Sequence, residues 1–440
     1  MRINLEREAL AEAVAWVARS LPSRPVMPIL SGLLLEADPD GLTLSCFDYE
    51  VSARIRVEAK VSEPGTALVP GRLLAEITRS LPPLPVEISD DGEDVTLACG
   101  PASFTLVTLP VREYPRLPEL PRLAGTVDGG VLAAAIGQVV SAASRDDTLP
   151  VITGVNLEIE GDVLRMVATD RYRLAVRDLR WEPAQPDAHG TLLVPAKTLS
   201  DAARMLASGV PARIMTRGTG PGAAEAGRAD ALRAADAMVG FESGGRRLTT
   251  RLIGGEYIKY SSRFPDEFGS QGEMPAVALA EAVRRVALVA ERGTSVRLSF
   301  GHGQVTIEAG TEGQARARET VPAEFAGEET TIAFSPQYLL DGLGGALTAA
   351  TGTPPGPDKP SSGKASKKGS GGKAGPEKAS PEQAGPGGAG ELAADPDHAR
   401  IQLRFTSPTK PALITGSART GDESPSDYRY LVVPLRALAG

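Results

Sequence analysis

The hexapeptide ALAEAV occurs twice in this chain, at 9–14 and again at 278–283, and a looser copy, VLAAAI, stands at 131–136. A second pattern follows each copy in the same order: GTALVPGRLLAEI at 65–77, GTLLVPAKTLSDA at 190–202 and TTIAFSPQYLLDGL at 330–343. The first two copies are separated by nearly constant offsets, 131−9=122 and 190−65=125. A fixed order at a fixed period indicates three copies of one structural module, of which the third is the most diverged.

The chain length agrees with this repeat, because 440 residues suffice for about three domains of ~150 residues each. We predict domains at 1–122, 123–270 and 271–440. Apolar residues recur at helical spacing in two segments of each copy, and alternate with polar residues in the stretches between them. The predicted helices are 7–20, 72–80, 131–143, 196–206, 277–290 and 336–347. This pattern favours the α+β class, with two helices on one face of antiparallel sheets in each module.

Two segments do not fit the regular pattern. The Ala- and Gly-rich stretch 217–237 is compatible either with a short extra helix or with a hairpin loop. The stretch 349–395 consists mainly of Gly, Pro, Ser, Lys and Ala, and no Leu, Ile, Val, Phe, Tyr or Met occurs between Leu347 and Leu392. Without apolar residues to bury it cannot offset the entropy of ordering, so we predict a disordered insertion. Its six lysines outnumber its acidic residues, and we interpret such a charged stretch as a solvated surface insertion in preference to an arm that touches DNA.

The charge pattern is acidic overall but basic at repeated positions. Lys and Arg number 47 against 55 Asp and Glu, which gives a formal net charge of −8 and argues against a globally basic nucleic-acid binder. Arg72 and Arg79 lie seven residues apart, hence on one helix face, and the offset of 125 maps them onto Lys197 and Arg204. Arg24 extends the same predicted surface. A basic face without interleaved aromatics suits the phosphates of duplex DNA.

The third copy departs from this charge pattern. Gln337 and Gly344 stand where the first two copies have basic residues. Its other helix supplies Arg284, Arg285 and Arg292 instead. This weaker basic pattern in the third copy leaves open an alternative function, in which the chain is a scaffold that binds proteins and not DNA.

The residues that catalysis or a metal would require are sparse. Cys46 and Cys99 lie in apolar runs without CxxC spacing, and the three histidines are far apart, so no metal site and no cofactor are expected. Adjacent acids at Asp146–Asp147 would point in different directions on a strand or a helix, which makes a catalytic pair a weak alternative. No run approaches the ~20 apolar residues of a membrane helix. We therefore expect a non-catalytic, cytoplasmic protein.

Four motifs, taken in chain order, resemble those of the bacterial DNA polymerase III β-subunit (sliding clamp) family. They are SRPVMPILSGLLLEA at 23–37, ATDRYRLAVR at 168–177, FTSPTKPALIT at 405–415 and YLVVPLR at 430–436. The resemblance implies three clamp domains per chain with helices inward and sheets outward. It also implies a head-to-tail homodimer whose ring encloses duplex DNA and tethers polymerase and clamp-loader subunits, which makes the chain a processivity factor.

The same resemblance assigns residues to two sites. Residues expected to contact DNA are Arg24, Arg72, Arg79, Lys197 and, by the repeat offset, Arg204. A pocket for short hydrophobic segments of partner proteins is expected from Ile152, Thr169, Arg173, Leu174, Ile258, Arg263, Val433, Pro434, Leu435 and Arg436. Without the resemblance, the apolar members of this second set would be interpreted as ordinary core residues.

The pocket segments depart from the family pattern at three positions. Ile258 stands where the family usually has Pro, Arg263 where it usually has an aliphatic residue, and Val433 where it usually has Met. We interpret these departures as a reshaped pocket. Together with the insertion, they leave open whether the chain is a main replication clamp or a second copy with an altered pocket.

Overall fold

The computed structural model describes residues 1–217, 237–290, 294–310, 315–351, 399–417 and 427–435. Most of the segment 217–237, the larger part of the insertion 349–395, and Arg292 lie outside the described residues. The predicted start of the insertion is wrong by three residues, because Ala349–Thr351 still belong to a helix. Ala350 is buried there, and the Thr351 hydroxyl donates to the carbonyl oxygen of Leu347 at 2.9 Å.

One order of elements occurs three times, which confirms the α+β class and the threefold repeat. Module 1 comprises β1 (Arg2–Leu5), α1 (Arg7–Ala18), η1 (Pro28–Ser31), β2 (Gly32–Asp38), β3 (Gly41–Phe47), β4 (Val51–Val57), β5 (Lys60–Glu63), β6 (Gly65–Pro70), α2 (Gly71–Ser80), β7 (Val86–Asp90), β8 (Asp94–Cys99) and β9 (Ala102–Val107). Module 2 comprises β10 (Arg122–Asp128), α3 (Gly129–Val140), η3 (Pro150–Thr153), β11 (Gly154–Glu160), β12 (Val163–Thr169), β13 (Arg173–Arg180), β14 (Glu182–Pro183), β15 (His189–Pro195), α4 (Ala196–Ala203), β16 (Pro211–Arg217), β17 (Met238–Ser243) and β18 (Arg246–Arg251). Module 3 comprises β19 (Ser270–Pro275), α6 (Ala276–Val286), η5 (Ala287–Val289), β20 (Val296–Gly301), β21 (Gln304–Gly310), β22 (Arg316–Pro322), β23 (Glu324–Ala326), β24 (Thr330–Phe334), α7 (Pro336–Thr351), β25 (Arg400–Phe405), β26 (Ala412–Ser417) and β27 (Tyr428–Val432).

The repeated strand-to-helix transition rests on prolines at the boundary. Pro70, Pro195 and Pro275 precede α2, α4 and α6, with φ values of −58°, −54° and −59°. A proline ring holds φ near the helical value and has no N–H group that would need a partner at the helix start. Each strand therefore passes directly into its helix without a loop.

Antiparallel pairing continues from one module into the next. The strand order β14-β10-β16-β17-β18-β4-β3-β2-β6 makes one nine-stranded sheet from modules 1 and 2. A second nine-stranded sheet, β15-β11-β12-β13-β27-β26-β25-β19-β23, joins modules 2 and 3. We call the β18–β4 contact the first joint and the β27–β13 contact the second joint. The sequence patterns predicted the strands but not these shared sheets.

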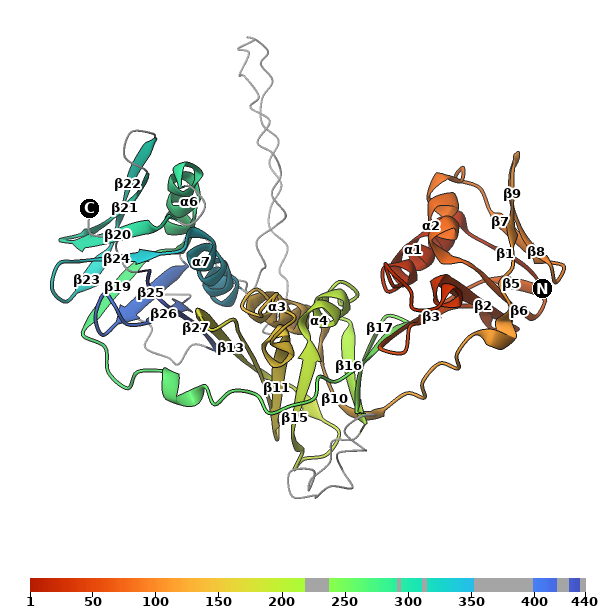
Figure 1. The fold of residues 1–440 in the computed structure, drawn as a ribbon, viewed down its shortest axis with the longest axis horizontal. Helices are drawn as coiled ribbons and strands as arrows, with labels where there is room; N and C mark the ends of the chain where they lie inside the picture. Colours follow the sequence, from red (N-terminus) through yellow and green to blue (C-terminus); the bar gives the residue numbers. More distant parts are fainter. Residues whose placement is uncertain (218–236, 291–293, 311–314, 352–398, 418–426, 436–440) are drawn as a thin grey trace, which may run out of the picture.

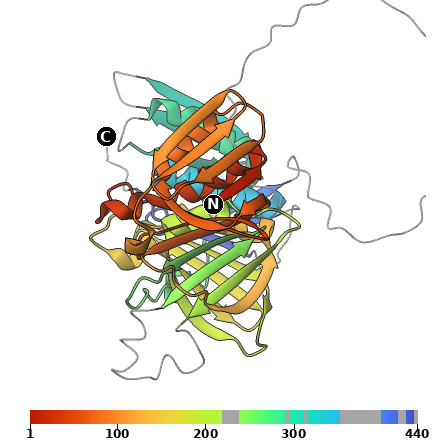
Figure 2. The ribbon, with the colours of Figure 1, turned by 90° about the vertical axis from the view of Figure 1, so that its right-hand side faces the viewer.

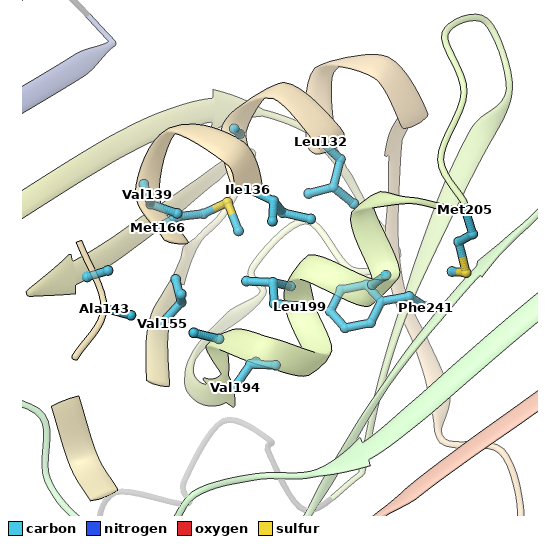
Figure 3. Packing of buried hydrophobic residues seen from close by; sticks show 14 of the residues in the cluster. Leu132, Ile136, Val139, Ala143, Val155, Met166, Val194, Leu199, Met205 and Phe241 are labelled. Carbon is cyan, nitrogen blue, oxygen red and sulfur yellow. The ribbon is translucent and has the colours of Figure 1, made fainter. Parts of the chain in front are cut away.

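The modules form an arc with their helices on the concave side and their sheets on the convex side (Figure 1). Viewed from the end that carries module 1, module 2 extends below it and module 3 lies behind it (Figure 2). Each helix pair covers the inner face of its sheets. In module 2, Leu132, Ile136 and Val139 of α3 point toward Val155 of β11 and Leu199 of α4 (Figure 3). Aliphatic side chains therefore make up most of this core.

One predicted element differs from the observed one near residues of interest. The helix expected at 196–206 ends at Ala203, so Arg204 stands at its C-cap. Among the described helices, none is both long and apolar enough to cross a membrane.

Candidate functional site

A tight turn between β12 and β13 shapes one side of a pocket. Asp170 Oδ1 accepts the N–H groups of Tyr172 and Arg173, both at 3.0 Å. The Thr169 hydroxyl accepts the N–H of Arg171 at 3.2 Å and donates to the carbonyl oxygen of Arg173 at 2.6 Å. These bonds hold Arg171 at a φ of 79°, a conformation that side chains other than Gly, Asn and Asp adopt rarely. The turn thus presents the Arg171 and Tyr172 side chains outward at the end of the second joint.

The pocket itself has a volume of about 340 Å³ and lies where β13 pairs with β27. Both strands and the turn before β13 contribute side chains, as do the segment between modules 2 and 3 and the residue before β26. Its lining residues are Thr169, Arg171, Tyr172, Arg173, Leu174, Ile258, Arg263, Pro411, Leu431 and Val433. Both modules 2 and 3 are therefore needed to build it.

A small hydrophobic cluster separate from the main core supports the pocket floor. Leu174 and Leu431 pack with Val167, Val176, Tyr260 and Leu413. The segment between β18 and β19 runs along the convex side and places Tyr257, Phe264 and Phe268 against this cluster. The Tyr260 hydroxyl donates to Glu158 at 2.7 Å, and burial followed by this contact raises the pKa of Tyr260. This segment between β18 and β19, which we call the linker, is thus fixed in place beside the apolar floor.

Arg173 connects the two modules as well as lining the pocket. Its guanidinium donates to Asp170 at 3.0 Å and to Asp341 of α7, and lies 4.4 Å from the centre of the Tyr338 ring. Burial disfavours the charge, but the contacts with Tyr430 and Asp341 outweigh it and raise the pKa of Arg173. Most of its charge is therefore neutralised within the chain.

The structure brings six of the expected pocket residues together: Thr169, Arg173, Leu174, Ile258, Arg263 and Val433. Ile152 lies in η3 and is buried outside the lining set. Pro434 is also buried outside the lining set, whereas the N–H of Leu435 donates to the carbonyl oxygen of Ala333 in module 3 at 2.8 Å. Arg436 lies outside the described residues.

Four lining residues were missed by the sequence analysis although three of its motifs contain them: Arg171, Tyr172, Pro411 and Leu431. The departures Ile258 and Arg263 both face the pocket, which places the chain's unusual residues at this site.

The residues expected to contact DNA are all solvent-exposed. Arg72 and Arg79 lie on α2, Lys197 on α4 and Arg204 at its C-cap, and Figure 1 shows both helices on the concave side. Arg24 lies in the loop between α1 and η1. Two of them make contacts within the chain: Arg204 pairs with Asp201 at 2.7 Å, and Arg72 donates to the carbonyl oxygen of Pro22 at 3.1 Å.

The described parts of α6 and α7 carry two basic residues, of which one is paired with acids. Arg285 on α6 pairs with Glu281 at 3.3 Å and with Glu319 of β22 at 2.5 Å. Arg284 is exposed on the same helix. The weaker basic pattern read from the sequence therefore persists in the structure.

The acids Asp146 and Asp147 lie in the loop after α3. Asp146 Oδ1 accepts the hydroxyl and the N–H of Thr148 at 2.6 and 3.1 Å, and these bonds lower its pKa. That arrangement caps a turn. Within the ranges that the structure describes, no group of three or more His, Cys, Asp or Glu side chains is placed to hold a metal ion.

Comparisons with known proteins cover nearly the whole chain. Family models of the DNA polymerase III beta subunit match in order: the N-terminal domain at 1–118, the central domain at 126–259 and the C-terminal domain at 261–350. The beta sliding clamp of Streptomyces coelicolor is 46% identical over 436 residues, 99% of each chain. A beta sliding clamp homolog of Streptomyces muensis, GriR, is 38% identical over the same share.

Solved structures give the same fold. The DNA polymerase sliding clamp of Bacillus subtilis superposes with a TM-score of 0.76 at 24% identity, covering 99% of both chains. The DNA polymerase III subunit beta of Pseudomonas aeruginosa gives a TM-score of 0.75 at 24% identity, over 99% of this chain and 100% of that one.

Proposed function

The chain belongs to the DNA polymerase III beta subunit family, and we propose that it acts as a sliding clamp. In this role it is a non-catalytic processivity factor in the cytoplasm. Two chains close a ring around duplex DNA, and the pocket at the second joint tethers polymerase and clamp-loader subunits. The observation that carries the proposal is the pair of sheet edges, β9 and β22, that the repeated joints leave open.

Both joints use equivalent strands of the repeat. At the first joint the last strand of module 2, β18, pairs with β4; at the second, the last strand of module 3, β27, pairs with β13. In the element order of the repeat, β9 corresponds to β18 and β27, and β22 corresponds to β4 and β13. Each of β9 and β22 is the edge of its own sheet. A second copy whose β9 pairs with β22 would therefore repeat the joint already present twice.

The register of this third joint follows from the other two. Thr249 pairs with Ser52 at the first joint, and Leu431 with Leu174 at the second. The hairpin glycines Gly100 and Gly244, at φ values of 56° and 55°, set β9 at an offset of 244−100=144 from β18. The ladders set β22 at an offset of 322−180=142 from β13. Thr105 of one chain (249−144) is thus expected opposite Arg316 of the next (174+142).

The exposure of the two edges agrees with this pairing. Phe104 on β9 and Ala317 on β22 are half-buried and would face each other, whereas Ser103 would lie opposite Arg318, both exposed. An open, unprotected strand edge favours pairing with another chain. Because β9 and β22 are different surfaces, the contact is head-to-tail, and a head-to-tail contact whose rotation closes gives a ring.

A ring linked topologically to DNA has a property that a basic patch lacks. We expect the protein, once loaded by its clamp loader, to stay on nicked circular DNA through high-salt gel filtration and to leave the same DNA after linearisation. Retention measured as labelled protein in the DNA fraction checks this. Equal retention on circular and linear DNA would contradict the clamp proposal.

The concave basic residues are expected to act through phosphate charge. Replacing Arg72 and Lys197 by Glu changes the charge by −4 per chain, so we expect salt-sensitive DNA association to weaken by about 10-fold or more and its salt dependence to flatten. Fluorescence titration at several salt concentrations measures both quantities. The matched control, Arg54→Glu with Arg180→Glu, changes exposed arginines on the sheets. Equal loss in both variants would mean that the inner-face assignment is wrong.

A further inference from the structure

The pocket surrounds an apolar floor with positive charge. Three of its ten lining residues are arginines, Arg171, Arg173 and Arg263, and none is acidic. The floor consists of aliphatic side chains and proline, including Leu174, Leu431 and Val433. The charge on the rim therefore has no acidic counterpart in the pocket wall itself, and its availability depends on what each arginine contacts.

Arg173 is already neutralised by carboxylates of its own chain. Asp170 and Asp341 both accept from its guanidinium, whose side chain is 9% exposed. Its role at the pocket is to hold α7 against the β12–β13 turn. It therefore offers little charge to a bound segment.

Arg171 and Arg263 differ from Arg173 in this respect. Both are solvent-exposed, and neither forms an ion pair with any residue in the described ranges. Arg171 is close enough to Asp146 to lower the pKa of that carboxyl group, but the hydrogen bonds from Thr148 to Asp146 lower it more. Arg171 and Arg263 are thus positioned to interact with an acidic group on a ligand.

Two lysines add to the positive field. Lys259 follows the lining residue Ile258, Lys410 precedes the lining residue Pro411, and both are exposed. The acids within two residues of the lining set are Asp170, which is bonded to Arg173, and Glu256. Two exposed arginines therefore line the pocket and two exposed lysines adjoin its lining residues, against two exposed acids nearby, Glu256 and Asp146.

We propose that this pocket selects hydrophobic peptide segments flanked by Asp or Glu. This inference rests on the proposed function, because it names the class of partner segment that the same pocket takes. Complementary charge on the rim of an interface favours one partner over another more than it adds affinity. The apolar side chains would occupy the floor, and the flanking carboxylates would lie beside Arg171 and Arg263.

The test uses the full chain and three fluorescent peptides with one apolar core, flanked by two Asp, two Asn or two Lys. Anisotropy titration at low salt should give the order Asp, Asn, Lys. Two exposed ion pairs should make the Asp peptide bind about 3- to 10-fold more tightly than the Asn peptide, a ratio that falls as salt rises. In Arg171→Gln/Arg263→Gln, the ratio of the Asp-peptide affinity to the Asn-peptide affinity should fall to about 1.

The matched control is Arg180→Gln, which removes an exposed arginine at the far end of the same strand, β13, where it pairs with Asp162. It should keep the wild-type ratio. If the Asp and Asn peptides bind the wild-type protein equally, the charge preference is overturned while the pocket's function stands. If no peptide binds at any concentration up to millimolar, both the preference and the proposed pocket function are overturned.

Discussion

Replacing Thr105 by proline should convert a ring of two chains into single chains of 45.8 kDa. The N–H of Thr108 donates to the carbonyl oxygen of Glu93 across the β8–β9 ladder. Successive N–H groups along a strand point to opposite sides of it, so the N–H of Thr105, three residues away, points to the open edge. Proline removes that donor and introduces a ring where the partner's β22 would lie, while it leaves the bonds to β8 intact. Sedimentation equilibrium at micromolar concentration measures the mass directly.

The expected effect is large because each ring contains the contact twice. Removing the donor leaves the partner's acceptor unsatisfied, which costs about 1–3 kcal/mol, so two contacts lose roughly 2–6 kcal/mol, or about two to four powers of ten in the dimer dissociation constant. Thr105→Val is the matched control, because it keeps the N–H and the β-branched shape, and it should remain dimeric. A dimeric Thr105→Pro protein with unchanged affinity would show that β9 does not form the ring contact.

The elements of this fold could be predicted from the sequence because each module carries its own local pattern. Alternating residues indicated β4, and the period of the apolar residues indicated α2. The joints could not be predicted in the same way. Arg246 of β18 pairs with Ile55 of β4, residues separated by 191 positions (246−55), and both strands have the pattern of ordinary half-buried strands. Pairing between modules depends on their shared orientation, which no local pattern records.

The pocket was only partly predictable for a related reason. The β12–β13 turn and the β27 motif each indicated some lining residues, but a motif does not say which of its side chains face a neighbouring module. Pro411 and Leu431 were missed because their role depends on the second joint. Pro434 was included because its motif contains it and Ile152 because the family resemblance implies it, yet local backbone paths bury both outside the lining set.

The repeat also indicates why the second joint differs from the first. Module 1 contains the same turn at an offset of 122, with Asp48 Oδ1 accepting the N–H groups of Glu50 and Val51 at 3.0 and 2.7 Å and Tyr49 at a φ of 75°. At the position of Thr169, however, module 1 has Phe47, which is buried and whose ring centre lies 5.4 Å from that of Tyr49. A large ring thus occupies the place that threonine leaves open beside the pocket.

Thr169→Phe should therefore close the pocket and keep the fold. Phe47 shows that the same turn accepts this side chain, so we expect the thermal unfolding midpoint to fall by a few degrees at most, from the loss of the two hydroxyl hydrogen bonds. A bulky group in the central pocket of an interface should weaken peptide binding by about 30-fold or more, equivalent to about 2 kcal/mol. Anisotropy titration with the Asp-flanked peptide measures it.

Two comparisons make the outcome of Thr169→Phe decisive. Thr169→Ser keeps the hydroxyl and the open pocket, so it should bind the peptide as the wild-type protein does. The mass of the Thr169→Phe protein in solution should stay that of the dimer, because the second joint is far from β9 and β22 along the arc. If Thr169→Phe binds the peptide with wild-type affinity while remaining folded, the segment docks somewhere other than between β13 and the linker, since the ring would fill the space that binding requires.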